Sequence, residues 1–576
     1  MTTTDLEKDL VPMSFDFGDN RAESGERNSD DLIHYQGELG DFWYDPKEFK
    51  VRQTATVPSE REGYSRNEEH DFLCYVGKGN SVSLPKGCIN MRHMFHGCEL
   101  PEGFKLVDFD TSNVISMEAM FCDCILPEGL SLGDKFDTSN VKRMDSMFAE
   151  CSLKGNIFVG DKFDTSNVKN MDHMFMDSDA AAVIIGDKFN TSNVTDMSCM
   201  FCGTELPSGF TLGNKFDTSN VTDMNSMFCR CKIASGFTLG NKFDTSNVTD
   251  MSCMFCKCEL PSGFTLGNNF DTSNVTNMYS MFCKCELSSG FTLGNKFDTS
   301  NVTDMSCMFC QCKLPSGFTL GNKFDTNNVR NMCSMFCQCK LLSGFTLGNK
   351  FDTSNVTDMC SMFCQCKLPS GFTLGNKFDT YNVEIMNAMF AECEMATGFS
   401  LGDRFNTSNV RDMYGMFYGC VFPADFSLGK KFITSNVARM SYMFNRCDLP
   451  ERFFLMDSFD ISNVKEMKYM FSECVLTGNS TFAQIEDTEA KIDYLREKRP
   501  STTSDAQAAT SEDKTLLNDF LKILGKKPDE YFWLQSNYEK LSKDQLLSII
   551  TSFMVVIEGN ALEKLYDKVR DNYKGN

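Results

Sequence analysis

Cysteines are the residues of this chain best suited to chemistry, because a thiolate can bind a metal, form a disulfide or attack an electrophile. The 576 residues include 28 of them. Thirteen recur at one place in a repeated sequence, where only Ser178 and Thr204 interrupt them. This first column is Cys98, Cys124, Cys151, Cys231, Cys258, Cys285, Cys312, Cys339, Cys366, Cys393, Cys420, Cys447 and Cys474. A small buried residue at the end of a helix accounts for Cys, Ser and Thr alike.

A second column lies two residues earlier and makes a C-x-C motif in the central copies. Its members are Cys229, Cys256, Cys283, Cys310, Cys337 and Cys364. Three interpretations stay open: reduced structural thiols, disulfides within or between copies, and a metal–thiolate array. Neighbouring copies would bring Cα atoms into the range that a disulfide permits. C-x-C lacks the paired C-x₂-C spacing of a zinc site, and in a helix positions i and i+2 point to different sides.

Other catalytic or ligand-binding patterns are missing from the sequence. The five histidines are His34, His70, His93, His96 and His173. His93 and His96 have i, i+3 spacing, but no third metal ligand is evident near them. There is no nucleophile elbow, Walker A loop, dinucleotide-binding fingerprint or H-E-x-x-H motif. We therefore expect no enzyme activity, no catalytic, cofactor-binding or metal-binding residues, and no cofactor.

The chain is dominated by one phrase, GFTLGNKFDTSNVTDMSCMFCKCELPS, of which a clean copy starts at Gly236. Its anchoring phenylalanine recurs fourteen times, in steps of 27 residues except for one step of 26. These residues are Phe109, Phe136, Phe163, Phe189, Phe216, Phe243, Phe270, Phe297, Phe324, Phe351, Phe378, Phe405, Phe432 and Phe459. A half copy, residues 90–98, precedes them. A period of this length predicts a stack whose units are stable only beside their neighbours.

Within one copy, the alternation over residues 237–239 predicts a very short strand with Phe237 and Leu239 pointing inward. A helix of about three turns should follow, with Asn247 as its N-cap and Asp250 close to a capping box. Val248, Met251, Met254 and Phe255 have the spacing of one helix face. The expected fold is therefore an α/β solenoid, a leucine-rich-repeat-like stack of about fourteen strand-turn-helix coils.

Polar residues also form columns. The first begins at Asn113 and is interpreted as structural, through capping and amide hydrogen bonds between copies: Asn113, Asn140, Asn167, Asn193, Asn220, Asn247, Asn274, Asn301, Asn328, Asn355, Asn382, Asn409, Asn436 and Asn463. A lysine column (Lys215, Lys242, Lys296, Lys323, Lys350, Lys377) precedes an aspartate column (Asp217, Asp244, Asp298, Asp325, Asp352, Asp379) by two residues. We expect these opposite charges to form a solvated face, with a calcium role for the aspartates as the alternative.

The charge and hydrophobicity of the chain exclude some classes of binding partner. The net charge of −23 argues against nucleic acid and against anionic membrane surfaces. No stretch reaches the ~20 apolar residues of a membrane-spanning helix. The first residues, MTTTDLEKDLVPMSFDF, carry neither a basic region nor an apolar core, so no classical signal peptide is expected.

Four regions follow from these patterns. Residues 1–80 are acidic and predicted to be mostly disordered, with an aromatic cluster at 41–49 that is a cap or a short binding motif. Residues 81–475 form the repeat solenoid with its N-terminal capping half repeat. Residues 476–513 hold a helix, about 482–499, and a polar linker. Residues 514–576 are predicted to be a small all-α domain, which could self-associate or dock on the stack.

The phrase F-D-T-S-N-V-T-D-M-S-x-M-F, as at residues 243–255 and 297–309, resembles the BspA-like leucine-rich-repeat surface proteins. The resemblance covers about residues 109–475 and implies a leucine-rich-repeat-like fold with a role in adhesion or protein binding. Similar repeats occur in unicellular eukaryotes and large DNA viruses, so we expect a cytoplasmic or a virion- or host-cell-associated protein. The prediction is a non-catalytic repeat protein with a protein partner. The alternatives are a structural or virion-associated scaffold assembled through residues 514–576, and a cysteine-rich metal–thiolate binder.

Overall fold

The computed structural model of the chain describes residues 33–37, 40–45, 50–53, 64–67, 72–75, 81–84, 88–154, 159–179 and 189–499. The chain divides into two compact units. The first comprises residues 1–453 and 457–488, and the second comprises residues 454–456 and 489–576. The predicted helical domain at 514–576, the polar linker and the first 32 residues lie outside the described residues.

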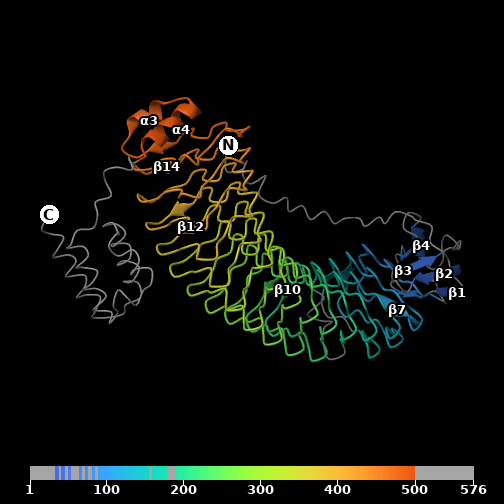
Figure 1. The fold of residues 1–576 in the computed structure, drawn as a ribbon. Coiled ribbons are helices and arrows are strands. Elements are labelled where there is room, and N and C mark those ends of the chain that lie inside the picture. The colour runs from blue at the N-terminus through green and yellow to red at the C-terminus, as the bar shows by residue number, and fades with distance from the viewer. Residues whose placement is uncertain are drawn as a thin grey trace, which may run out of the picture. The chain divides into compact units, whose positions relative to one another are not determined.

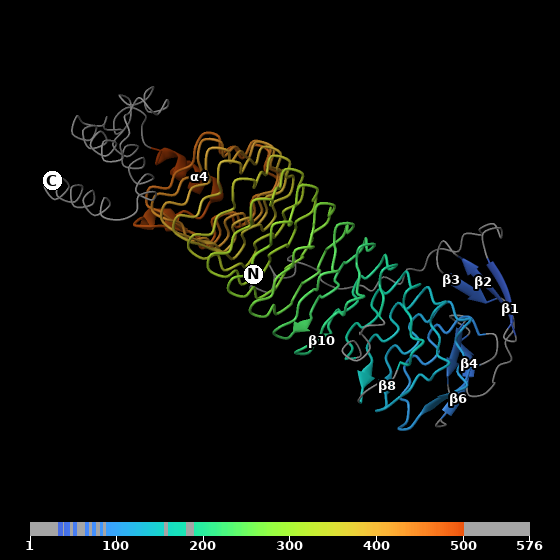
Figure 2. The same cartoon turned by 90° about the horizontal axis from the view of Figure 1, so that it is seen from below.

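The repeat region is a series of similar loops, one for each copy, which we call rungs (Figure 1). Seen from below, the rungs follow one another in sequence order (Figure 2). Parallel bridges join each rung to the next at equivalent positions, without a break from Asn90 to Glu466. The tandem copies are therefore held side by side by backbone pairing that repeats every rung.

A second line of parallel pairing follows the cysteines and produces most of the two-residue strands. These are β8 (Ile125–Leu126) with β9 (Ser152–Leu153), β10 (Glu205–Leu206) with β11 (Lys232–Ile233), β12 (Lys367–Leu368) with β13 (Glu394–Met395), and β14 (Asp448–Leu449) with β15 (Val475–Leu476). Near the first rungs, β6 (Ser81–Ser83) pairs in parallel with β7 (Lys105–Val107).

The predicted repeat helix is wrong: the described residues 88–154, 159–179 and 189–479 contain no helix. Two successive turns occupy its place, and each contains a left-handed residue, such as Cys253 with φ 55° and Lys257 with φ 60°. The amide groups of Met251, Cys253, Phe255 and Lys257 donate to carbonyls of the next rung, at 2.7–3.1 Å. These donors therefore serve rung-to-rung pairing and cannot make the i→i−4 bonds of a helix.

The predicted strand at residues 237–239 also needs correction. Phe237 and Leu239 are buried and Thr238 is exposed, which confirms the inward and outward alternation. However, the described residues at this position carry no strand in any rung except β7. The parallel backbone bridges between rungs recur instead at the positions equivalent to Asp250 and Glu259.

Columns of phenylalanine form the core of the stack. The ring of Phe255 stacks on Phe228 and on Phe282 with centroid distances of 5.6 and 5.8 Å. A second column stacks in the same way, as between Phe243 and Phe270 at 6.5 Å. Val248, Met251 and Met254 are fully buried beside them, as the spacing predicts. Each ring thus packs against the adjacent rungs, which favours stability as a sum over nearest neighbours.

After the last rung, α3 (Ser480–Gln484) begins at the N-cap Asn479, whose side chain accepts a hydrogen bond from the Phe482 amide at 3.1 Å. Phe482 is fully buried, with its ring edge-on to Phe471 at 6.1 Å. The second unit contains all of α4 (Thr488–Glu497) except its first residue. The predicted single helix over 482–499 is therefore two helices, because the chain becomes extended at Ile485.

Five strands lie in the N-terminal region that the sequence predicts to be mostly disordered. β1 (Ile33–Gly37), β2 (Gly40–Asp45) and β3 (Lys50–Gln53) form an antiparallel sheet in that order. β4 (Tyr64–Asn67) and β5 (Phe72–Tyr75) form an antiparallel pair. The aromatic cluster at 41–49 falls largely on β2, the central strand of its sheet. Its role as a cap or binding motif stays a prediction.

Candidate functional site

Two features stand out from the repeat: a polar outer face and a buried line of thiols. The outer face consists of the asparagine column and the residue two positions after each asparagine; we call it the asparagine face. Each asparagine from Asn140 to Asn463 donates its Nδ2 to a backbone carbonyl of the preceding rung, at 2.6–2.7 Å. The predicted bonding between copies is confirmed, but the acceptor is backbone, and no helix exists for the repeat asparagines to cap.

Threonines complete this face in the central rungs. Thr249 is exposed, and its Oγ1 donates to the Thr222 carbonyl of the preceding rung at 3.2 Å. Its backbone amide donates to the same carbonyl at 2.9 Å. Both side chains of the face are therefore held in place before any ligand binds. A surface fixed in this way loses little conformational entropy on binding.

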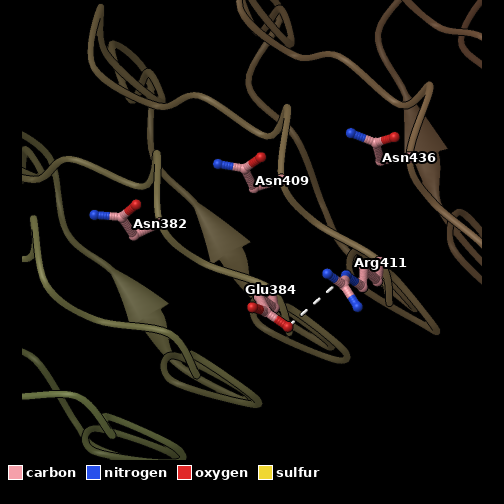
Figure 3. Close-up of a pocket in the computed structure, with 5 residues that line it drawn as sticks. All are labelled: Asn382, Glu384, Asn409, Arg411 and Asn436. Carbon is pink, nitrogen blue, oxygen red and sulfur yellow. Dashed lines mark ion pairs between the residues drawn. The ribbon is translucent and has the colours of Figure 1, made fainter.

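A shallow groove of about 360 Å³ lies on the asparagine face where charged residues replace the threonines. Its lining is Asn382, Asn409 and Asn436 together with Glu384 and Arg411. Figure 3 shows the three asparagines in a row, with the ion pair of Glu384 and Arg411 beside them. That pair spans 3.8 Å and both side chains are exposed. The groove thus offers amides and both signs of charge on adjacent rungs.

The lysine and aspartate columns pair across rungs rather than within one. Lys242 contacts Asp217 of the preceding rung at 3.4 Å, and Lys350 contacts Asp325 at the same distance. Each aspartate oxygen also accepts the amide two residues later, as Asp217 does from Ser219 at 3.1 Å. Partial burial by itself would raise the pKa of Asp217. The hydrogen bonds from Ser219 and the nearby Lys242 outweigh this effect and lower the pKa below its usual value. The column therefore fixes turns and forms the predicted solvated charge pairs.

Behind this surface, the threonine of each DTSN phrase is completely buried. Thr245 donates its Oγ1 to the Asp271 carbonyl of the next rung at 2.7 Å. Twelve equivalent threonines from Thr111 to Thr434 make the same bond. This bond between rungs was not predicted from the sequence.

The first cysteine column is structural. The thiol of Cys420 donates to the Phe390 carbonyl, 30 residues earlier, at 2.8 Å, and Cys447 donates to Phe417 in the same way. Thr204 makes the corresponding bond through its hydroxyl, to Phe175. Burial raises the pKa of Cys258 and Cys285 well above the ordinary value of a thiol. The prediction of small buried residues is confirmed, although they end a turn and not a helix.

The second cysteine column forms a line of contacting thiols. We call it the cysteine seam and define it as Cys202, Cys229, Cys256, Cys283, Cys310, Cys337 and Cys364. Each seam thiol lies close enough to the seam thiol of the next rung to influence its pKa, and all seven belong to one buried cluster. Cys253 and Cys307 belong to the same cluster, and Cys199 packs against it. All seven seam residues are buried. Cys202 is absent from the second column as predicted from the sequence.

One end of the seam carries a guanidinium. Arg230 places one Nη2 atom 3.7 Å from the Cys202 sulfur and 2.9 Å from the Asp177 carboxylate. Asp177, Gly203 and Arg230 occupy the same position on three successive rungs. A Cβ on Gly203 would lie 1.8 Å from an Asp177 oxygen. Glycine therefore opens the gap through which Arg230 and Asp177 meet above the Cys202 thiol.

A related arrangement follows the other end of the seam. Glu392, Gly419 and Arg446 occupy the same position on three successive rungs as Asp177, Gly203 and Arg230. Here Arg446 donates to the hydroxyl of Tyr418 at 3.0 Å and pairs with Glu473 at 3.0 Å. Tyr418 stands where the seam has a cysteine. The same position thus presents a phenol at one end and a thiol at the other.

A buried ionic cluster lies on the early rungs. Arg143 contacts Asp145 at 2.7 Å and Glu118 at 3.2 Å, and Arg92 also contacts Glu118. Burial and then Glu118 raise the pKa of Asp145 to about 7, against the effect of Arg143. His93 and His96 are close to Arg92 in sequence. Their rings contact each other edge-on, with 5.1 Å between the ring centroids.

Comparison with known proteins identifies the repeat. A family described as "Mycoplasma protein of unknown function, DUF285" matches seven overlapping stretches: residues 89–208, 124–238, 179–286, 231–337, 264–367, 316–421 and 396–484. Together these cover most of the chain. The chain belongs to the DUF285 family. Most DUF285 matches span about four rungs, so the family corresponds to a block of rungs rather than to one copy. No curated protein and no solved structure matches the chain.

Two further observations concern the remaining predictions. Within the described part of this DUF285 chain, no group of three or more His, Cys, Asp or Glu residues is arranged to hold a metal ion. Among those same residues, no helix combines the length and the apolar character needed to cross a bilayer. Self-association through 514–576 concerns residues outside the described ranges and stays a prediction.

Proposed function

We propose that this protein is a non-catalytic repeat protein that binds a protein partner through the asparagine face. The observation that carries the proposal is the ladder of asparagine amides, each held by a backbone carbonyl of the preceding rung. Such side chains are ordered before binding, and each keeps a carbonyl oxygen that can accept a hydrogen bond. The ladder is long, regular and polar, which suits an extended partner contacted over several rungs.

The groove at Asn382, Asn409 and Asn436 is where we place specificity. Along the central rungs the face repeats Asn and Thr, so one register resembles the next. Glu384 and Arg411 interrupt that repetition with opposite charges. Charges at the edge of an interface fix register and suppress wrong partners more than they add affinity. The charges at the groove would therefore fix the position of a partner along the stack, and the central rungs would provide most of the contact area.

The resemblance to BspA-like leucine-rich-repeat surface proteins supports the same class of function, adhesion or protein binding. Under this proposal the rungs act as a solenoid that displays the face, and the number of rungs sets its length. The scaffold and metal–thiolate alternatives stay hypotheses. No described contact favours either over binding.

The test compares two sets of matched substitutions in the full-length chain. Thr222, Thr249 and Thr276 are replaced by Lys on the asparagine face; Lys142, Lys169 and Lys465 already occupy that column. The control set replaces Thr238, Thr265 and Thr292 by Lys, which are exposed on another part of the rung. Proteins captured by each chain are quantified, and dissociation constants are then measured with the purified captured protein.

We expect the first set to weaken binding by about tenfold or more, since unfavourable charges within an interface cost several kcal/mol. The control set should bind like the unmodified chain. Equal binding by all three chains would contradict the proposal. Loss of binding only in the control set would assign the function to the other face and contradict it as well.

A further inference from the structure

The cysteine seam differs from the first cysteine column in what its thiols contact. First-column thiols donate to backbone carbonyls, and burial raises their pKa. Seam thiols instead pack together in one buried cluster. Adjacent strands lie ~4.8 Å apart, which falls within the Cα separation of about 4.4–6.8 Å that a disulfide needs. Neighbouring seam cysteines are therefore candidates for disulfide formation.

Cys202 is distinguished within the seam by its cation. Arg230 approaches its sulfur to 3.7 Å, and Asp177 holds the same guanidinium from the other side at 2.9 Å. Gly203 provides the space for this contact, because any side chain there would collide with Asp177. A guanidinium beside a thiol favours the thiolate, which is the nucleophilic form. The neighbouring Cys199 and Cys229 thiols, together with Arg230, lower the pKa of Cys202 below its ordinary value.

Two resolving thiols stand next to Cys202. Cys199 lies three residues earlier in the same turn and is only partly buried, so it connects the site to solvent. Cys229 occupies the next rung of the seam. Cys202 itself is 6% exposed. A small oxidant can reach such a sulfur, whereas a protein substrate cannot.

We propose that Cys202 is a peroxide-reactive cysteine that contacts Arg230 and forms a disulfide with Cys199 or Cys229 after oxidation. The Cys202 sulfur attacks one oxygen of a hydroperoxide. A sulfur–oxygen bond forms, the oxygen–oxygen bond breaks, and the departing oxygen takes a proton to become water or an alcohol. The sulfur loses two electrons and becomes a sulfenic acid, while the peroxide is reduced.

The second step needs no further oxidant. The neighbouring thiol attacks the sulfenic sulfur, so that a sulfur–sulfur bond forms and the sulfur–oxygen bond breaks. The hydroxide that leaves combines with the thiol proton to give a second product, water. Overall, two thiols and one hydroperoxide yield one disulfide, one water and one water or alcohol. The reaction is stoichiometric, so it is compatible with a non-catalytic binding protein and does not rest on that function.

The test uses the full-length, reduced chain and less than one equivalent of hydrogen peroxide. Remaining thiols are alkylated, and disulfides are mapped by mass spectrometry. The peptide containing Cys199 and Cys202 is distinguishable from those of other copies because the C-G-T-E-L sequence around Gly203 occurs once. We expect Cys202 to be linked to Cys199 or Cys229 before other thiols react.

Arg230→Gln is the decisive variant, because Gln311, Gln338 and Gln365 occupy the same position on other rungs and the stack accommodates them. It should slow formation of the Cys202 disulfide by about tenfold or more, as expected for loss of a hydrogen bond to a charged group. Lys257→Gln, one rung later at the same position, is the matched control and should leave the rate unchanged.

Cys333 and Cys360 provide an internal reference. They are partly buried, and their thiols, on adjacent rungs, lie close enough to influence each other's pKa. Oxidation of this pair at the same rate as Cys202 would overturn the proposal, since contact between thiols alone would then be sufficient. An unchanged rate in Arg230→Gln, with circular dichroism showing an intact fold, would overturn it too.

Discussion

The rungs at Gly203 and Gly419 share one local arrangement but place different functional groups in it. In both, glycine replaces a side chain and an arginine from the next rung reaches the space above the seam position. Arg230 meets the thiol of Cys202 there, whereas Arg446 meets the hydroxyl of Tyr418. The backbone is the same in both, since Gly203 and Gly419 have φ of 72° and 63°. The difference teaches that the repeat fixes where the arginine lies, whereas the residue at the seam position determines which functional group the arginine contacts.

Replacing Tyr418 by Cys should produce the largest effect, because it converts the second site into a copy of the first. Tyr418 is 6% exposed, so its truncation should lower the free energy of unfolding by about 2–4 kcal/mol. The new thiol would lie beside Arg446, but Ala391 and Asn445 flank it in the column. Its sulfenic acid should therefore persist without forming a seam disulfide.

A diketone probe specific for sulfenic acids, followed by peptide mapping, checks this prediction. Tyr418→Phe serves as the control, because it keeps the ring and introduces no thiol. If Cys at position 418 is labelled no faster than Cys333, an arginine above the seam does not activate a thiol and the comparison fails.

The next effect comes from adding a methyl group to each glycine. Gly203→Ala places Cβ against the Asp177 carboxylate at 1.8 Å, whereas Gly419→Ala meets Glu392 Cγ at 3.2 Å. Both variants share the cost of a left-handed alanine, ~1–2 kcal/mol. We expect only Gly203→Ala to lose the contact between Asp177 and Arg230 in addition. Urea unfolding should therefore show the larger loss for Gly203→Ala, and equal losses would contradict the role assigned to the gap.

The smallest effect concerns the carboxylates that compete for each arginine. Asp177→Asn should leave Arg230 to Cys202 alone and raise the alkylation rate of Cys202 about two- to fivefold, since an exposed ion pair contributes ~0.5–1 kcal/mol. Glu473→Gln removes the carboxylate that pairs with Arg446 and should leave the alkylation rate of Cys202 unchanged. Stability should change little in either variant.

The same measurement across pH sharpens the comparison. The groups that face Cys202 are Cys199, Cys229, Cys231, His173, Asp177 and Arg230. Because the net effect lowers the pKa of Cys202, its thiolate persists as the pH falls below that of an ordinary thiol. Its alkylation should therefore continue at pH 6, where Cys258 is unreactive. Parallel pH profiles for the two cysteines would contradict the assignment.

Much of the core was predictable because the period fixes it. Phe243, Phe255, Val248 and Met251 are buried as their spacing predicts. The helix was not, because an apolar i, i+3, i+4 pattern fits two consecutive turns as well as a helix. The deciding factor is whether the amide of Phe255 bonds within its own copy or to Met281 of the next rung. Such long-range pairing leaves no mark in the local pattern.

The site at Cys202 was only partly predictable for a related reason. The seam requires the contact between one rung and the next, which a reading of a single copy does not provide. A signal was nevertheless present: Gly203 stands where neighbouring copies carry Asp177 and Arg230. A glycine among charged residues in a repeat column indicates that a neighbour needs its space. That the asparagine column bonds between rungs was predictable from its repetition, but its backbone acceptors were not.

The seam also has a consequence for how such a gene can change. Duplicating one central copy would insert one more sulfur into the seam and leave the contact between Arg230 and Cys202 untouched. The capacity of the protein to store reducing equivalents would then grow with copy number, while the place at which oxidant is received would stay single. Slippage during replication could tune the former without any mutation at the latter.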